Sequence, residues 1–224
     1  MMELRDIAFS YPGSDFRLAV PALDLAEGER VAVVGPSGTG KTTLLNLIAG
    51  IAVPQAGRIT IDDAVMTGLS DGARRTLRAD KIGFVFQDFA LLDYLSAREN
   101  ILYPFRITGG TPLDADARSR AERLAEACGL TGKLGRRPGA LSQGEQQRVA
   151  LCRALVRQPK LILADEATGN LDPENKSAIL DLLFSRTREA GASLLAVTHD
   201  HDLLPRFDRV IDFADYRVDA GGAA

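Results

Sequence analysis

The sequence contains little cysteine, no excess of positive charge and no long apolar run. Its two cysteines, Cys128 and Cys152, are too few for a disulfide framework, so we assign both to packing in a reducing compartment. The 27 basic residues stand against 30 acidic ones, and this net charge of -3 lacks the basic footprint of nucleic-acid-binding proteins. No segment approaches the roughly 18 consecutive apolar residues of a membrane span, and residues 1–6 do not resemble a secretory signal. We therefore expect a chain that neither crosses a membrane by itself nor binds nucleic acid.

The composition is that of a globular domain. Of the 224 residues, 46% are hydrophobic and 25% are charged, and a chain of this length buries roughly 70% of its unfolded surface. Short apolar runs between turn residues predict strands, and longer segments of helix-forming composition predict helices. The predicted strands are residues 4–9, 16–20, 30–34, 58–61, 82–86, 161–164, 193–197 and 209–212, and the predicted helices are residues 41–49, 95–103, 114–128, 142–157 and 173–189.

The order of these elements predicts one α/β domain over residues 1–218. Strands alternate with helices in both outer parts of the chain, which favours a largely parallel sheet covered by helices. Residues 88–156 are predicted to be a helical subdomain inserted into a core made of residues 1–87 and 157–218. Residues 219–224 offer nothing to pack and are predicted to be a flexible tail.

A glycine-rich segment, Gly35-Pro36-Ser37-Gly38-Thr39-Gly40-Lys41-Thr42, connects the apolar strand at 30–34 with the helix at 41–49. Glycines allow a backbone to curl so that its N–H groups point at phosphate oxygens, and the helix N-terminus adds partial positive charge. In this pattern Lys41 reaches the β- and γ-phosphates and the Thr42 hydroxyl binds Mg²⁺. A glycine-rich turn without a ligand is the alternative, but strand, lysine and hydroxyl together predict a nucleotide site.

Two carboxylates, Asp165 and Glu166, end the apolar run at 161–164. A strand that is buried on both faces has this composition, and its C-terminal end is where α/β sheets bind ligands. There Asp165 is predicted to hold Mg²⁺, and Glu166 to orient and deprotonate the attacking water. The alternative is a pair that caps the following turn, which the upstream phosphate loop disfavours.

A second glycine motif, Leu141-Ser142-Gln143-Gly144-Glu145, begins the helix at 142–157. Ser142 and Glu145 have the spacing of a capping box, so capping alone explains both residues. It does not explain Gly144, because glycine inside a helix costs roughly 1 kcal/mol relative to alanine. A backbone that must closely approach a phosphate would explain it.

These motifs, in this order and spacing, resemble those of ATP-binding cassette (ABC) ATPases, from Tyr11 to about Asp202. The resemblance implies a P-loop NTPase core with a mostly parallel sheet, an N-terminal antiparallel β part and the inserted helical subdomain. It implies that Tyr11 stacks on adenine and that residues 169–172 communicate across a dimer. The nucleotide contacts that it implies are Tyr11, Gly35, Pro36, Ser37, Gly38, Thr39, Gly40, Lys41, Thr42, Thr43, Ser142, Gln143, Gly144 and Glu145.

The resemblance also implies the reaction, which is hydrolysis of ATP with Mg²⁺. Glu166, Gln87, His199 and Lys41 are the catalytic residues that it implies, and Thr42, Gln87 and Asp165 are the metal ligands. Two chains would enclose two ATP molecules, each between one phosphate loop and the partner's Ser142-Gln143-Gly144-Glu145, as a head-to-tail homodimer. Two positions depart from the family pattern: Gln143 replaces a glycine and Ala167 replaces a proline. Neither removes a catalytic group, but Gln143 puts the rate of hydrolysis in question.

Segments outside these motifs resemble one subfamily, the lipoprotein-releasing and macrolide-export ATPases, which drive membrane permeases by mechanical transmission. They are Gly68-Leu69-Ser70, Arg78, residues 82–92, Glu99-Asn100 and Pro104. The likeness implies export or lipoprotein extraction and a peripheral, cytoplasmic position on the inner face of the cell membrane. A coupling helix of the permease would dock near residues 88–103, with contacts from Phe89, Leu91, Leu92, Tyr94 and Leu95 or, alternatively, with these side chains merely buried.

Two other classes use the same catalytic domain. A division-associated ABC ATPase signals through a membrane partner without transport. A soluble ABC ATPase acts on ribosomes or DNA, but usually carries two cassettes or long coiled-coil insertions, neither of which is present in this sequence. The transported substrate is not encoded here, because in this family the permease contacts the cargo.

Overall fold

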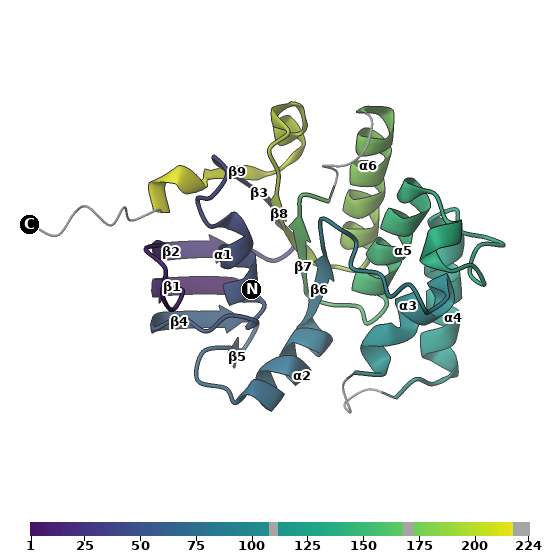
Figure 1. Cartoon of the computed structure of the whole chain (residues 1–224), viewed down its shortest axis with the longest axis horizontal. Helices are drawn as coiled ribbons and strands as arrows, with labels where there is room; N and C mark the ends of the chain where they lie inside the picture. Colours follow the sequence, from purple (N-terminus) through teal and green to yellow (C-terminus); the bar gives the residue numbers. More distant parts are fainter. Residues whose placement is uncertain (108–111, 168–172, 217–224) are drawn as a thin grey trace, which may run out of the picture.

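A computed structural model describes residues 1–107, 112–167 and 173–216. Two sheets form its centre (Figure 1). One is antiparallel, with strand order β2-β1-β4-β5, and the other is entirely parallel, with order β6-β7-β8-β3-β9. Both the parallel sheet and the N-terminal antiparallel part were predicted. The strands are β1 (Met2–Ser10), β2 (Arg17–Leu25), β3 (Arg30–Val34), β4 (Ala56–Ile61), β5 (Ala64–Val65), β6 (Ile82–Val85), β7 (Leu161–Asp165), β8 (Ser193–Val197) and β9 (Arg209–Asp212).

The helices form near the predicted positions, with one addition. Each of the five predicted helices is present, although the one predicted at 95–103 is shorter because residues 103–105 form a 3₁₀ turn. The α-helices are α1 (Lys41–Ile48), α2 (Asp71–Lys81), α3 (Ala97–Leu102), α4 (Ala115–Ala127), α5 (Gln143–Leu155) and α6 (Pro173–Glu189), and the 3₁₀ helices are η1 (Tyr103–Phe105), η2 (Pro138–Ala140), η3 (His201–Arg206) and η4 (Phe213–Tyr216).

Helix α2 is the α-helix that the sequence analysis missed, and the two-residue strand β5 was missed as well. None of the residues of α2 is buried, and Leu77 is its only large apolar residue, so its sequence has no series of large apolar residues at helical spacing. Local signals were present at both ends: Ser70 accepts a hydrogen bond from the Ala73 amide, and Arg78 and Lys81 lie in the last turn. The residues at the two ends of α2 therefore indicated a helix, whereas the spacing of its apolar residues did not.

Strand β2 continues past the residue at which the sequence suggested that it ends. The prediction stopped at Val20, before Pro21, but the strand runs to Leu25. Proline is tolerated because β2 is an edge strand, where one backbone N–H has no neighbouring strand to donate to.

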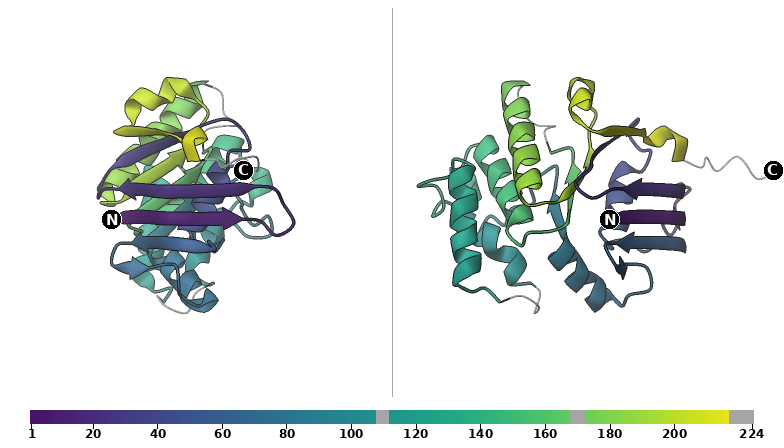
Figure 2. Two further views of the ribbon diagram at one scale, coloured as in Figure 1. Left: turned by 90° about the vertical axis from the view of Figure 1, so that its left-hand side faces the viewer. Right: turned by 180° about the vertical axis from the view of Figure 1, so that it is seen from behind.

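The main core lies between the two sheets, around α1 (Figures 1 and 2). Apolar side chains from β1, β2, β4, α1, β3 and β8 meet there. On the opposite face of the parallel sheet, α5 and α6 pack on β7 and β8. Every residue of β7 and β8 is buried, which explains why both appear in the sequence as unbroken apolar runs.

Helices α3, α4 and α5 pack around an apolar cluster of their own. Cys128 and Cys152 lie in this cluster as buried, unbridged thiols, which confirms their packing role. Helix α5 also contacts the parallel sheet so closely that a Cβ on Gly83 of β6 would lie 2.3 Å from the Ala154 carbonyl oxygen. Among the described residues, no helix combines the length and the apolar character that crossing a bilayer requires.

Candidate functional site

The phosphate loop follows the C-terminal end of β3, which is an interior strand of the parallel sheet. The loop leads directly into α1. Its backbone adopts conformations with φ of 145° at Gly35, 79° at Gly38 and 101° at Gly40. Gly40 is the N-cap of α1 and supplies no side-chain hydrogen bond to the first turn. The first N–H groups of α1 therefore have no side-chain cap from Gly40 and are candidate donors for an anion.

The Lys41 side chain lies within the loop, and only 8% of the residue is exposed. Its Nζ donates to the Gly35 carbonyl at 2.7 Å and to the Pro36 carbonyl at 2.9 Å. The Thr39 hydroxyl also donates to the Pro36 carbonyl, at 2.9 Å. A nearly buried ammonium is thus held at the centre of the turn, within reach of any anion that the backbone binds.

Two aromatic rings, those of Tyr11 and Phe16, lie beside the phosphate loop. The Tyr11 hydroxyl and the Thr43 hydroxyl lie 3.1 Å apart, and the Tyr11 and Phe16 ring centroids are separated by 5.7 Å. Phe16 was missed as a site residue because the sequence analysis placed it in a strand. It lies so close to the loop that a Cβ on Gly40 would come within 2.7 Å of its ring. No local pattern marks Phe16, since the contact arises only when the first two strands fold over the loop.

The acidic pair follows β7, the strand two places from β3 in the sheet. Asp165 is 8% exposed, and burial raises the pKa of its carboxyl, although a hydrogen bond with Thr42 partly opposes this. Glu166 adopts a left-handed backbone conformation with φ of 45°. Such a conformation in a residue with a side chain is uncommon, and it often marks a functional position.

Gln87 and His199 converge on Glu166. Gln87 Nε2 donates to Glu166 Oε2 at 3.1 Å, and His199 Nδ1 lies 3.4 Å from the same oxygen. Because β6, β7 and β8 are neighbours in a parallel sheet, the residues that follow them meet at one edge. The three residues, far apart in the sequence, are therefore brought together as the resemblance implied.

A cavity of about 380 Å³ lies against the phosphate loop, and Glu166 is part of its lining. Asp165, Gln87 and His199 are not among the described residues that line it. Of the predicted nucleotide contacts on the phosphate-loop side, Gly35, Pro36 and Thr39 do not line it. The others do, and Phe16 and Val197 are added. The described residues that line it are Tyr11, Phe16, Ser37, Gly38, Gly40, Lys41, Thr42, Thr43, Glu166 and Val197.

The segment Ser142-Gln143-Gly144-Glu145 does not line this cavity in the described part of the chain. The Ser142 hydroxyl accepts from the Glu145 amide at 3.2 Å, and the Glu145 carboxylate accepts from the Ser142 amide at 2.9 Å, so the predicted capping box is present. A Cβ on Gly144 would meet nothing closer than Arg148 at 3.6 Å, so the fold itself does not require glycine there. Residues 169–172 lie outside the described residues.

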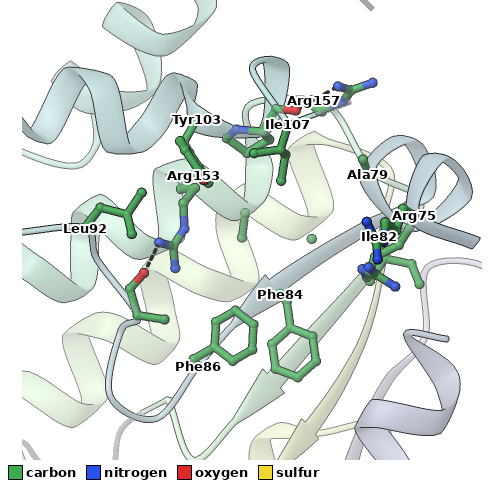
Figure 3. A pocket seen from close by; sticks show the side chains of 15 residues that line it. Arg75, Ala79, Ile82, Phe84, Phe86, Leu92, Tyr103, Ile107, Arg153 and Arg157 are labelled. Atoms are coloured by element: carbon green, nitrogen blue, oxygen red, sulfur yellow. Dashed lines mark hydrogen bonds between the residues drawn. The ribbon is translucent and has the colours of Figure 1, made fainter. Parts of the chain in front are cut away.

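A second cavity, of about 410 Å³, lies between the parallel sheet and the helices (Figure 3). Phe84 and Phe86 form an apolar wall, with their ring centroids 4.1 Å apart, and Arg75, Arg153 and Arg157 also line the cavity. We call this cavity the groove. It is lined by Arg75, Arg78, Ala79, Ile82, Gly83, Phe84, Phe86, Ala90, Leu92, Tyr103, Pro104, Ile107, Arg153, Ala154 and Arg157.

The groove only partly matches the contacts expected from the sequence. Of the five candidates, Leu92 lines it. Phe89 is buried at 7% exposure, and Leu91 packs against the helical cluster. Tyr94 is 69% exposed and does not belong to the lining, and neither does Leu95. The lining comes mainly from α2, β6, η1 and α5, and most of it lies outside residues 88–103.

Known proteins resemble the chain in sequence. A family model described as ABC transporter matches residues 18–169, more than half of the chain. A lipoprotein-releasing system ATP-binding protein LolD of Roseobacter denitrificans is 41% identical over 99% of this chain and 96% of its own length. A protein with the same description from Gluconobacter oxydans is 46% identical over 87% of this chain and 84% of its own length.

Solved structures agree with these sequence matches. A dimeric structure of the ATP-binding cassette MJ0796 in a post-hydrolysis state, bound to ADP and Pi, superposes with a TM-score of 0.84. Its sequence is 32% identical, and the match covers all of both chains. A second dimeric structure of MJ0796, described as a bacterial ABC transporter cassette, gives the same values.

Proposed function

The chain belongs to the ABC transporter family and is an ATPase, and we propose that it powers a separate membrane permease that releases lipoproteins. We infer the reaction, ATP hydrolysis, from membership of the family. We infer the docking of a permease from the groove. The cargo is inferred from relatives described as parts of a lipoprotein-releasing system, the likeness that the sequence analysis had already noted.

The phosphate-loop cavity binds the nucleotide in this proposal. The adenine lies against Tyr11 and Phe16, and the N–H groups of residues 38–43 donate to the phosphates. The Lys41 ammonium, now held by the Gly35 and Pro36 carbonyls, turns to the β- and γ-phosphate oxygens. Within the described part of the chain, this nearly buried cation donates to the two carbonyl oxygens, and a polyanion would be a better partner, which supports this role.

The Thr42 hydroxyl, the Asp165 carboxylate and the Gln87 side chain would hold Mg²⁺. The donor set fits, because magnesium prefers oxygen ligands and the hydrogen bond of Thr42 places two of them together. Burial is the main cause of the raised pKa of Asp165, and a cation bound beside the carboxylate would oppose it, which supports the proposal. When bound, the ion neutralises charge on the phosphate oxygens.

Glu166 is assigned as the base that accepts a proton from the attacking water, and Gln87 orients that water. His199 supplies a donor for the γ-phosphate from the end of β8. Their convergence within 3.4 Å of one carboxylate oxygen is the observation that carries this assignment. Positioning and charge stabilisation then account for most of the rate, as is general in phosphoryl transfer.

The second half of the nucleotide site comes from another copy of the chain. Each cavity offers a phosphate loop without Ser142 and its neighbours, and these residues begin a helix elsewhere on the surface. Gly144 has room for a side chain within its own subunit, so its small size suits an approach by the partner's nucleotide. The dimeric relatives of known structure support this arrangement.

The permease docks in the groove. Its stacked phenylalanines suit an apolar side chain, and Arg75, whose side chain is 66% exposed, suits a carboxylate on the same segment. Ile107 is 58% exposed at the groove, although isoleucine is usually buried. A short amphipathic helix that carries an acidic residue fits this chemistry.

The test is purification of the chain from membranes in mild detergent, followed by ATPase assays in proteoliposomes. We expect an integral-membrane permease to co-purify and a lipoprotein to stimulate hydrolysis. Ile107→Asp should lose the permease yet still bind ATP, because Ile107 lies in the groove and not in the nucleotide cavity. The matched control is Val210→Asp, since Val210 is 43% exposed on β9 and lines neither cavity. A stimulating cargo of another class would refute the lipoprotein assignment, and retention of the permease by Ile107→Asp would refute the docking site.

A further inference from the structure

The turn that follows Gln87 is strained. Phe89 has φ of 62° and Ala90 has φ of 45°, so two adjacent residues with side chains adopt the left-handed conformation. This conformation is unfavourable for such residues and persists only where neighbouring groups hold it. Ala90 is exposed, so packing of its own side chain does not hold it.

Arg153 of α5 contacts this turn directly. Its two terminal nitrogens donate to the Ala90 carbonyl and the Phe89 carbonyl, each at 2.5 Å, and Figure 3 shows the side chain reaching across the groove. Burial lowers the pKa of Arg153 to about 10, so the guanidinium is still charged at neutral pH. No carboxylate lies within salt-bridge distance of it among the described residues. The carbonyls of the strained turn are thus its main partners.

The rest of the segment is held from a different helix. The Asn100 side chain on α3 accepts from the Leu92 amide at 2.8 Å and donates to the carbonyls of Leu92, Leu95 and Ser96 at 3.1–3.2 Å. The loop between β6 and α3 is therefore fixed at its far end without Arg153. At its near end, Arg153 donates to the carbonyl of Phe89, which lies two residues after Gln87, and the Gln87 side-chain amide donates to Glu166.

We propose that Arg153 is a positioning residue for ATP hydrolysis: it holds the turn at Phe89 and Ala90, and this turn fixes Gln87 against Glu166. Arg153 also lines the groove and belongs to the helix that begins beside Ser142. A permease segment in the groove therefore acts on Gln87 through Arg153. This second statement rests on the proposed docking of the permease, whereas the first does not.

A double-mutant cycle on the chain alone tests the positioning role. Arg153→Ala should lower kcat about tenfold with little change in KM for ATP, because the nucleotide contacts stay intact. Ala90→Gly removes the penalty of the left-handed conformation, so Arg153→Ala should cost clearly less in that background. An equal loss of kcat in both backgrounds, or a loss confined to KM, would overturn the proposal.

Two further variants separate positioning from folding. Arg153→Lys keeps the charge but cannot donate to both carbonyls in a fixed fork, so we expect a kcat between those of Arg153→Ala and the unmodified chain. The melting temperatures of both variants should equal that of the unmodified chain. A kcat for Arg153→Lys as low as that of Arg153→Ala would then show that the contacts with the two carbonyls are not the cause of the loss. The control is Arg123→Ala, an exposed arginine on α4 that contacts Ser119, and its kcat should not change.

The complex with the permease tests the second statement. Arg153→Ala should still co-purify with the permease, but stimulation of hydrolysis by the permease should fall towards the rate of the chain alone. Full stimulation of this variant, or loss of the complex, would overturn transmission through Arg153. Failure of the unmodified chain to bind any permease would instead refute the proposed function and leave the result on the chain alone standing.

Discussion

The nucleotide cavity and the groove have similar volumes, about 380 and 410 Å³, but opposite construction. The nucleotide cavity is built largely from one continuous loop, residues 35–43, whose glycines and helix terminus present polar groups to a ligand. The groove is an apolar surface assembled from α2, β6, η1 and α5, with arginines in its lining. The polar groups of the nucleotide cavity suit a defined anion, whereas the groove results from the packing of helices on a sheet. The comparison predicts that changes in the first alter chemistry, whereas changes in the second alter stability and coupling.

Glu166→Gln is expected to have the largest effect. Loss of the base should lower hydrolysis at least about 100-fold. The melting temperature should change little, because a glutamine oxygen can still accept from Gln87. Size-exclusion chromatography with ATP and Mg²⁺ should show a closed dimer. A nearly unchanged rate would contradict the assignment of Glu166, and a monomer would contradict the ATP-sandwich dimer.

Gly83→Ala tests the construction of the groove. The added Cβ would lie 2.3 Å from the Ala154 carbonyl oxygen, so α5 must move away from β6, at a cost of about 1–3 kcal/mol. Chemical denaturation measures this loss of stability. The matched control is Gly72→Ala in α2, where a Cβ meets nothing within 4 Å and helix propensity favours alanine. Equal stability of the two variants would show that α5 and β6 are not as tightly packed as described.

Asp165→Asn should cause the smallest change in stability, and this change should be an increase, whereas Gly83→Ala lowers stability. Burial raises the pKa of Asp165 in the folded chain, so the unfolded chain releases this proton at lower pH. Stability is therefore lost as pH rises from the ordinary pKa through the raised one. Removing the charge should raise the melting temperature at about pH 7 without nucleotide or Mg²⁺, and should have little effect at pH well below 4.

Differential scanning calorimetry of Asp165→Asn and the unmodified chain at both pH values measures this difference. The variant should also lose most of its Mg²⁺-dependent hydrolysis, so stability and activity would change in opposite directions. An increase in melting temperature that is the same at both pH values would show that the charge of Asp165 is not the cause.

The two cavities also differ in how far the sequence predicted them. The phosphate loop, the acidic pair and the capping box at Ser142 are local patterns, and each was identified with its context. Gln87 and His199 were found through resemblance, since a single glutamine or histidine has no local signature. The groove itself was not predicted, because its lining residues are spread from Arg75 to Arg157. Of the permease contacts predicted at residues 88–103, only Leu92 lines it.

The sequence by itself determined most strands, most helices and the anion-binding turn, because apolar runs, caps and glycines act within a few residues of one another. Only the tertiary structure brought Phe16 over Gly40, joined Gln87 and His199 at Glu166, and placed Arg153 on the turn after Gln87. Each of these contacts depends on which strands are neighbours and how closely α5 lies on β6. Such distances are set by the packing of the whole core, to which every buried side chain contributes.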